Sequence, residues 1–175
     1  MQDLISDLIK VALPAGFVLY AFYLTIKAFL NKQLIEQQQN AQGEALKQVL
    51  PLRLQAYERL TLLLERISPN SLLIRNAGQA ITAVELQQLL LAEIRQEFQH
   101  NVAQQIYISH ENWERLRLTV QEVTSLINRS ASEVPAEAPA LDLARKISEL
   151  SVGRSMEVWQ ETLNAIKQEA QKIWQ

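Results

Sequence analysis

The sequence contains no cysteine, and only four of its 175 residues are glycine and five are proline. A chain without cysteine forms no disulfide, which agrees with a reducing compartment. The glycines, Gly16, Gly43, Gly78 and Gly153, are isolated from one another, so no glycine-rich loop can hold a phosphate group. No serine lies in a nucleophile-elbow motif. We therefore expect a protein that is not an enzyme, with no cofactor and no small-molecule substrate.

The chain also lacks an excess of either charge. It has 17 lysine and arginine residues against 19 aspartate and glutamate residues, which gives a net charge of −2, and the two signs are interleaved. Such a chain has no basic patch for nucleic acid and is typical of solvated helix faces. Leucine, alanine, glutamine and glutamate are abundant, and these residues favour helices. The composition predicts an all-α protein.

The longest apolar run lies near the start of the chain. Residues 11–26 contain no charged side chain, and residues 8–30 contain only Lys10 and Lys27. A helix of that length extends about 34 Å, and the hydrocarbon core of a bilayer is about 30 Å thick. We expect residues 8–30 to form a single transmembrane helix in contact with membrane lipid. The alternatives are a cleaved signal peptide, disfavoured by Asp3 and Asp7, and a buried core helix.

The basic residues next to this run predict its orientation. Lys10 stands alone on the N-terminal side, whereas Lys27 and Lys32 follow on the C-terminal side. Because basic flanks stay in the cytoplasm, we expect a single-pass protein of the bacterial inner membrane with its N-terminus outside and its body in the cytoplasm.

The predicted domain plan has three parts: a transmembrane anchor at residues 1–30, a helical stalk at 31–50, and an antiparallel four- to five-helix bundle at 51–175. The stalk is rich in glutamine, and Pro51 ends or kinks it because proline lacks an N–H group. The first body helix runs to Ile67, followed by a loop with a short extended piece at residues 72–74.

Capping motifs locate the remaining helices. Thr82-x-x-Glu85 is a capping box for a helix that reaches about Tyr107, and Ser109 caps the next one. Residues 130–139 are expected to form a loop before a fourth helix, and Ser155 is expected to cap the last helix.

The last helix carries the most regular apolar stripe in the chain. Its members recur at spacings of three and four residues: Val152, Met156, Trp159, Leu163, Ile166, Ala170 and Ile173. Two interpretations are open. The stripe packs on its own bundle, or it forms a surface for a partner helix or for self-association.

Polar residues line up along the second body helix. They follow helical spacing at Glu93, Glu97, His100, Asn101 and Gln104. The first body helix carries Arg53, Arg59 and Arg66, which are positioned to pair with this line. We predict a polar network that fixes the register of the two helices.

The same line offers an alternative metal site. Glu97 and His100 form a Glu-x-x-His element like those of carboxylate-bridged di-iron bundles. Such a site needs a second element of this kind and two further glutamates, and only Glu58 and Glu65 are placed to contribute. We therefore expect no metal and keep a metal-binding bundle as an alternative.

Two strings resemble an uncharacterised family of small Bacteroidota proteins. They are PLRLQAYERL at residues 51–60, and EIRQEFQHN at 93–101 with QQIY at 104–107. The resemblance covers residues 45–130 and implies an N-terminal span and a helical body, with no assigned activity. It draws attention to a set of polar residues on the two helices: Arg53, Tyr57, Glu58, Arg59, Glu97, His100 and Asn101.

These features together predict a non-catalytic accessory or scaffold protein that docks on another protein, whose identity the sequence does not give. The first alternative is a self-assembling coiled-coil scaffold, a homo-oligomer that uses the stalk and the terminal stripe as seams. The second is the metal-binding bundle.

Overall fold

The computed structural model describes the backbone of residues 2–173 and the side chains of residues 16–34, 36–37, 47–153 and 155–173. Within these residues it contains seven helices and no strand, so the predicted all-α class is confirmed. The chain divides into two compact units, Met1–Val49 and Leu50–Gln175. The finer division of the first unit at residue 30 stays a prediction.

Helix α1 spans Gln2–Ile67 without a break, so the predicted stalk is helical and the predicted end of its helix at Pro51 is wrong, whereas the alternative of a kink there stays a prediction. A proline inside a helix leaves the carbonyl group four residues earlier without its usual N–H donor. Here that carbonyl belongs to Lys47, which is exposed to solvent. Water can satisfy the Lys47 carbonyl, and the helix continues.

The predicted transmembrane anchor is not supported. Within the part of the chain that the structure describes, no helix combines the length and the apolar character needed to cross a bilayer. The predicted localisation as a single-pass inner-membrane protein is therefore contradicted.

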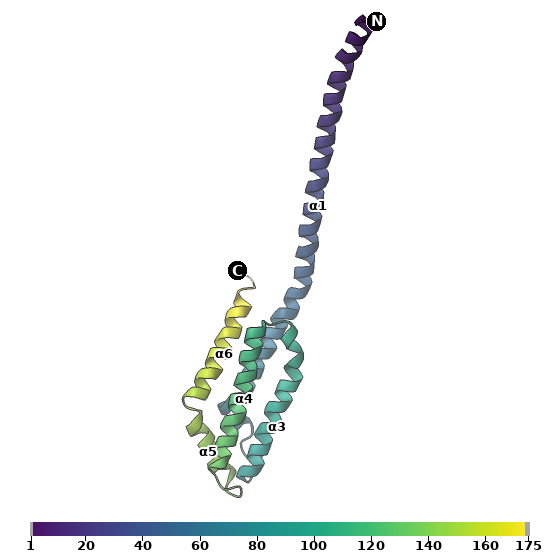
Figure 1. Cartoon of the computed structure of the whole chain (residues 1–175). Coiled ribbons are helices and arrows are strands. Elements are labelled where there is room, and N and C mark those ends of the chain that lie inside the picture. The colour runs from purple at the N-terminus through teal and green to yellow at the C-terminus, as the bar shows by residue number, and fades with distance from the viewer. Residues whose placement is uncertain (1, 174–175) are drawn as a thin grey trace. The chain divides into compact units, whose positions relative to one another are not determined.

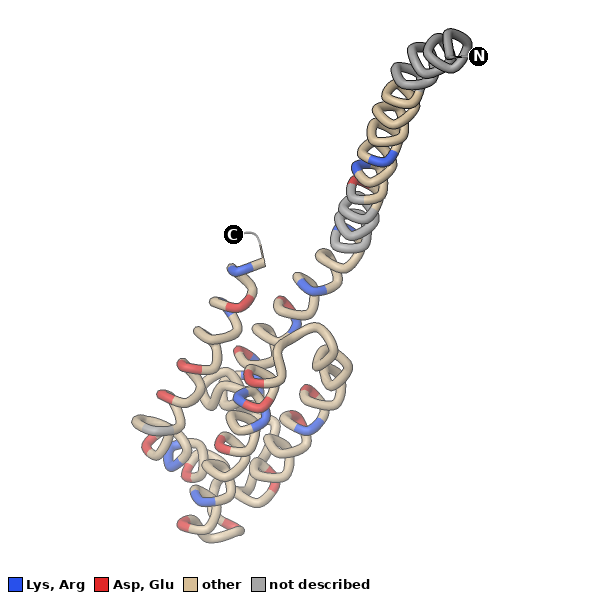
Figure 2. The backbone as a smooth tube through the Cα atoms, turned by 45° about the horizontal axis from the view of Figure 1, so that its top comes forward, with Lys and Arg blue, Asp and Glu red and all other residues tan. Residues whose placement is uncertain are grey.

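The second unit is a helical bundle (Figure 1). After the end of α1 it contains α2 (Pro69–Arg75), α3 (Ala83–Asn101), the 3-10 helix η1 (Val102–Ile106), α4 (His110–Ser132), α5 (Ala140–Ser151) and α6 (Arg154–Gln171). Helix α4 packs against α3, α5 and α6, and α5 also packs against α2 and α3. The core contains fully buried side chains from six helices, among them Leu60, Leu72, Leu90, Leu116, Leu143 and Ile166. Positions of basic and acidic residues are interspersed along these helices (Figure 2).

Two predicted caps are confirmed. Thr82 Oγ1 accepts a hydrogen bond from the backbone N–H of Glu85 at 3.4 Å, and Glu85 Oε2 accepts one from the N–H of Thr82 at 3.2 Å. Ser109 Oγ accepts a hydrogen bond from the N–H of Asn112 at the start of α4. These bonds satisfy N–H groups that have no partner inside a helix. Two more such groups, in Ala83 and Val84, donate to the carbonyls of Ala138 and Ala136 in the α4–α5 loop.

The structure differs from the predicted elements at three places. A helix, α2, replaces the loop and extended piece, because Ser68 caps it and Pro69 occupies its first position, where proline is favourable. Helix α3 ends at Asn101 and η1 follows it. Helix α6 starts after Gly153, which has a φ of 116°, and Ser155 donates to Glu122 instead of capping the helix.

Candidate functional site

The predicted polar face on α1 and α3 is divided into two separate clusters. One, which we call the α2 cluster, comprises Arg66, Arg75, Asn76, Glu93 and Glu97. The other, the Glu169 cluster, comprises Arg53, Tyr57, Ser109, Asn112 and Glu169. Each cluster includes residues from helices that the prediction did not consider.

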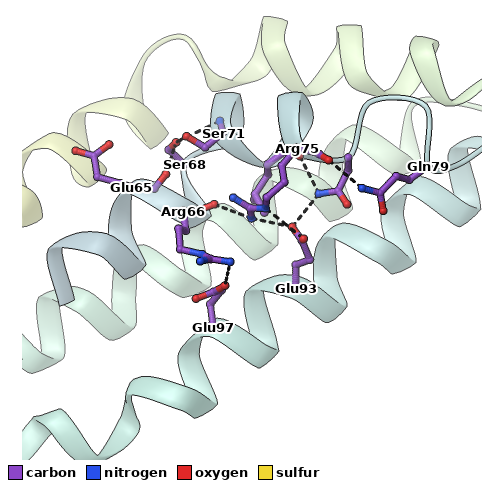
Figure 3. A network of polar contacts seen from close by, with 10 residues as sticks. Glu65, Arg66, Ser68, Ser71, Arg75, Gln79, Glu93 and Glu97 are labelled. Carbon is purple, nitrogen blue, oxygen red and sulfur yellow. Dashed lines mark hydrogen bonds and ion pairs between the residues drawn. The ribbon is translucent and has the colours of Figure 1, made fainter. Parts of the chain in front are cut away.

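The α2 cluster joins α1, α2 and α3 (Figure 3). Arg66 Nη2 lies 2.7 Å from Glu97 Oε1, which is the one direct pair of the predicted kind between α1 and α3 among the described residues. Glu93 faces α2 instead, where it accepts hydrogen bonds from Arg75 Nη2 and Asn76 Nδ2, both at 2.8 Å. Arg75 Nη2 also donates to the carbonyl oxygen of Arg66. The cluster therefore holds the short helix α2 against its two long neighbours.

The electrostatics of this cluster favour the charged state of both partners. Burial raises the pKa of the Glu93 carboxyl, but the hydrogen bonds from Arg75 and Asn76 outweigh it, and the pKa lies below its usual value. The hydrogen bond to Glu93 likewise raises the pKa of Arg75 above its usual value. Asn76 is buried, and its Oδ1 atom has no hydrogen-bond donor among the described residues.

The Glu169 cluster joins the end of α6 to α1 and to the start of α4. Glu169 accepts hydrogen bonds from the Tyr57 hydroxyl at 2.9 Å, the Ser109 backbone N–H at 2.8 Å and the Ser109 hydroxyl at 2.6 Å. The side-chain amide of Asn112 is a fourth donor. Arg53 donates to the Tyr57 hydroxyl and to the Tyr107 carbonyl.

The titration of this cluster follows from these contacts. Burial raises the pKa of the Glu169 carboxyl, but the hydrogen bonds from Ser109, Asn112 and Tyr57 outweigh burial and hold the pKa below its usual value. Burial, aided by the Glu169 charge, raises the pKa of Tyr57. A polar hollow of about 650 Å³ adjoins Glu169. Because four protein donors already occupy the carboxylate, this cluster is built to hold helices together.

Other residues of the predicted face take no part in either cluster. Glu58, Arg59 and His100 are exposed. Asn101 donates to the Glu97 carbonyl of its own helix, and Gln104 lies half-buried in η1. Within the described residues, no group of three or more histidine, aspartate or glutamate side chains is placed to hold a metal ion. The Glu97 and His100 pair therefore has no third ligand there.

The apolar stripe of α6 packs on its own bundle. Trp159, Leu163 and Ile166 are buried, and Trp159 Nε1 donates to the Leu64 carbonyl at 2.8 Å. Ile173 is partly buried against the same core, and Met156 remains 38% exposed. The first of the two interpretations describes this helix, because a side chain in the core is not available to a partner helix.

An apolar groove lies beside the α2 cluster. We call it the α2–α5 groove; its volume is about 720 Å³. It is formed by α2, the α2–α3 turn, the start of α3 and α5, with these side chains among its lining: Leu73, Ile74, Asn76, Ile81, Leu86, Leu141, Ala144 and Arg145. Ile74, Ile81 and Leu141 are 69%, 83% and 65% exposed. Asn76 belongs to both the groove and the α2 cluster, so the cluster fixes one wall of the groove.

The groove and both clusters depend on residues that sequence reasoning missed. Arg75 and Asn76 lie in the predicted loop, although Ser68 and Pro69 are the signal of a helix start that places them at the end of α2. Glu169 follows Ile166 at three residues, at the edge of the apolar stripe, and its contacts to Tyr57 and Ser109 span 112 and 60 residues. No local pattern predicts contacts over such separations.

A protein-family model described as a family of unknown function, DUF7935, matches residues 3–173. No curated protein and no solved structure matches this chain. The match covers nearly the whole chain, well beyond the predicted resemblance at residues 45–130. The chain belongs to this family.

Proposed function

We propose that this member of a family without an assigned function is a non-catalytic docking protein, which binds a segment of another protein in the α2–α5 groove. The observation that carries the proposal is the combination of an apolar groove with three large, exposed aliphatic side chains, Ile74, Ile81 and Leu141. Large side chains left in water beside a groove are typical of protein-binding surfaces.

The surroundings of the groove support a binding role. The ion pairs and hydrogen bonds of Arg75 and Asn76 to Glu93 hold α2 in place, so the groove has a fixed wall in the absence of a partner. A preformed surface loses less conformational entropy on binding than a mobile one. The two fixed walls, α2 and α5, also pack directly against each other.

Recovery of partners from the native host tests this proposal. The tagged full chain is compared with the double variant Ile81→Asp, Leu141→Asp and with the control Leu118→Asp, which changes a 59% exposed leucine on α4 outside the groove. We expect one or more proteins to be recovered with the wild type and the control. Their yield should fall at least about tenfold with the double variant, because buried interface anchors contribute about 2 kcal/mol or more each.

Two further results decide the outcome. The thermal unfolding of all three chains should be alike, because the changed residues are exposed. If the same proteins were recovered in the same amounts with all three chains, the groove would not be the docking site.

A second candidate function is self-association, and a different surface favours it. Every described side chain from residue 16 to residue 34 of α1 is exposed, including Phe17, Val18, Leu19 and Tyr20 in succession. Four consecutive residues surround a helix, so this stretch is apolar on all sides. We propose that it associates with the same stretch of other copies of the chain.

Sedimentation of the full chain over a range of concentrations tests self-association. We expect oligomers that dissociate when Phe22 is replaced by glutamate, while Leu118→Glu leaves them intact. A wild-type chain that stays monomeric, or that associates only with lipid vesicles, would rule this candidate out.

A further inference from the structure

The α2–α5 groove has a positive charge at its edge. Arg145 on α5 is exposed and is the only charged side chain among the described residues that line the groove. No ion pair of Arg145 occurs among the described residues, although Lys146, its neighbour, pairs with Glu133 at 2.6 Å and lies 4.0 Å from Glu149. A partner that places a carboxylate next to Arg145 would complement this charge.

The backbone around the groove restricts the conformation of the partner. The groove is lined by α2, α5 and the α2–α3 turn, and backbone N–H groups of the turn are already engaged: that of Ala77 donates to the Ile74 carbonyl and that of Ile81 to the Glu85 carboxylate. An extended peptide would find few backbone partners there and would leave its own polar groups unpaired in an apolar site. A helical segment satisfies its own backbone and presents apolar side chains at every third or fourth residue.

The charge pattern also argues against a second copy of this chain as the occupant. The apolar helical segment that another copy of this chain would most readily offer is residues 16–34 of α1. That segment carries Lys27 and Lys32. Both lysines have the same sign as Arg145, so their approach is unfavourable.

We infer that the α2–α5 groove binds an amphipathic helix of a different protein, with an acidic side chain on the flank of its apolar face that pairs with Arg145. This inference rests on the proposed docking function and names the chemistry of its partner. The apolar face of that helix covers Ile74, Ile81 and Leu141, and its carboxylate meets the guanidinium at the edge.

Designed peptides test the inference on the full chain. Three fluorescent helical peptides of about 18 residues share one apolar face and differ only in flanking residues, which are glutamate, glutamine or lysine. Fluorescence anisotropy gives the dissociation constant of each. We expect the glutamate peptide to bind about twofold to fivefold more tightly than the lysine peptide, the range expected for exposed ion pairs. The preference should shrink at high salt.

Two variants of the chain separate charge from apolar contact. Arg145→Glu should reverse the order of the peptides, whereas Arg95→Glu, the same change at an exposed position of α3 outside the groove, should preserve it. Ile81→Asp should weaken the binding of all three peptides. Thermal unfolding of each variant shows whether the bundle is intact.

The results that would contradict this inference differ from those that would contradict the proposed docking function. Equal affinity for the three peptides, or an order that Arg145→Glu leaves unchanged, would overturn the acidic partner while leaving groove-dependent recovery of proteins as support for docking. Tighter binding of a peptide with the sequence of residues 17–34 than of the glutamate peptide would replace the inferred partner with a second copy of the chain.

Discussion

Two parts of helix α1 are both rich in large apolar side chains but differ in their surroundings. From Phe17 to Leu34 the large apolar side chains are exposed, with Phe17 at 68%, whereas from Ala56 to Ile67 the core-facing ones, such as Leu60, are fully buried in the second unit. An apolar pattern therefore predicts that a surface is covered, but it does not show which other element or molecule covers it. In the second unit, residues 50–175, the other helices of the bundle cover the apolar face of α1. Measurements on matched residues of the two parts test this difference.

The largest expected effect comes from a matched pair of leucines on α1. Leu60 is fully buried and Leu24 is 45% exposed. We expect Leu60→Ala to lower the free energy of unfolding of the bundle by about 2–5 kcal/mol, because it removes buried methyl groups and leaves a cavity. Leu24→Ala should change it by less than about 0.5 kcal/mol. Urea denaturation measures both free energies of unfolding. Equal losses in the two variants would contradict the difference in burial between Leu60 and Leu24.

The next effect concerns the polar anchor of α6. Glu169→Ala removes an acceptor from Tyr57, Ser109 and Asn112. We expect a loss of about 1–3 kcal/mol in the free energy of unfolding, because these donors lose a charged partner. Glu161→Ala, at an exposed position of α6, is the control and should stay within about 0.5 kcal/mol. A loss equal to that of the control would show that the cluster does not hold α6.

The pH dependence of stability provides a second measurement on the same residue. The folded-state pKa of Glu169 lies below that in the unfolded chain, so its contribution is present above the unfolded value of about 4.3. It is lost as the pH falls through the folded value. Wild-type stability should therefore decrease more steeply on acidification below about pH 5 than that of Glu169→Gln. Parallel curves for the two chains would contradict the lowered pKa.

A smaller effect is expected at the start of α6. Gly153 has a φ of 116°, a conformation that side-chain-bearing residues rarely adopt, although a Cβ atom there would meet no neighbour. Gly153→Ala should therefore cost about 1 kcal/mol of unfolding free energy through backbone strain alone. Chemical denaturation checks this value, and no loss of stability would show that the turn relaxes.

The smallest effect belongs to the ion pair between α1 and α3. Arg66 is 54% exposed beside Glu97, so we expect Arg66→Gln to cost about 1 kcal/mol or less, and less still at high salt. A double-mutant cycle with Glu97→Gln isolates the pair. A coupling energy of several kcal/mol would show that this pair, instead of the buried leucines, fixes the register of the helices.

The sequence predicted the elements that depend on local patterns. Helix composition, the Thr82 capping box and the Ser109 cap were sufficient to locate the starts of α3 and α4. Predictions from local sequence patterns failed where the surroundings of a residue determine its structure. Pro51 stays within α1 because its surroundings are exposed, and the apolar run near the N-terminus does not meet the requirement for a span among the described residues.

The candidate site was less accessible to sequence reasoning. Of the polar residues predicted to line one helix, Gln104 lies in η1, and among the described residues only the Arg66 and Glu97 pair joins the line to α1 directly. Glu93 instead accepts a hydrogen bond from Arg75 of α2, and Tyr57 donates one to Glu169 of α6. The α2–α5 groove arises from residues far apart in the chain, such as Ile74 and Leu141, and only the folded bundle brings them together.

The central claim is that another protein occupies the α2–α5 groove, and position-specific photo-cross-linking in the native host tests it most directly. A photoreactive phenylalanine analogue is placed at Ile81 or Leu141, and at Leu118 as the exposed control outside the groove. The account predicts one cross-linked species containing a different protein from both groove positions and none from Leu118. The same species from all three positions, or none from Ile81 and Leu141, would contradict it.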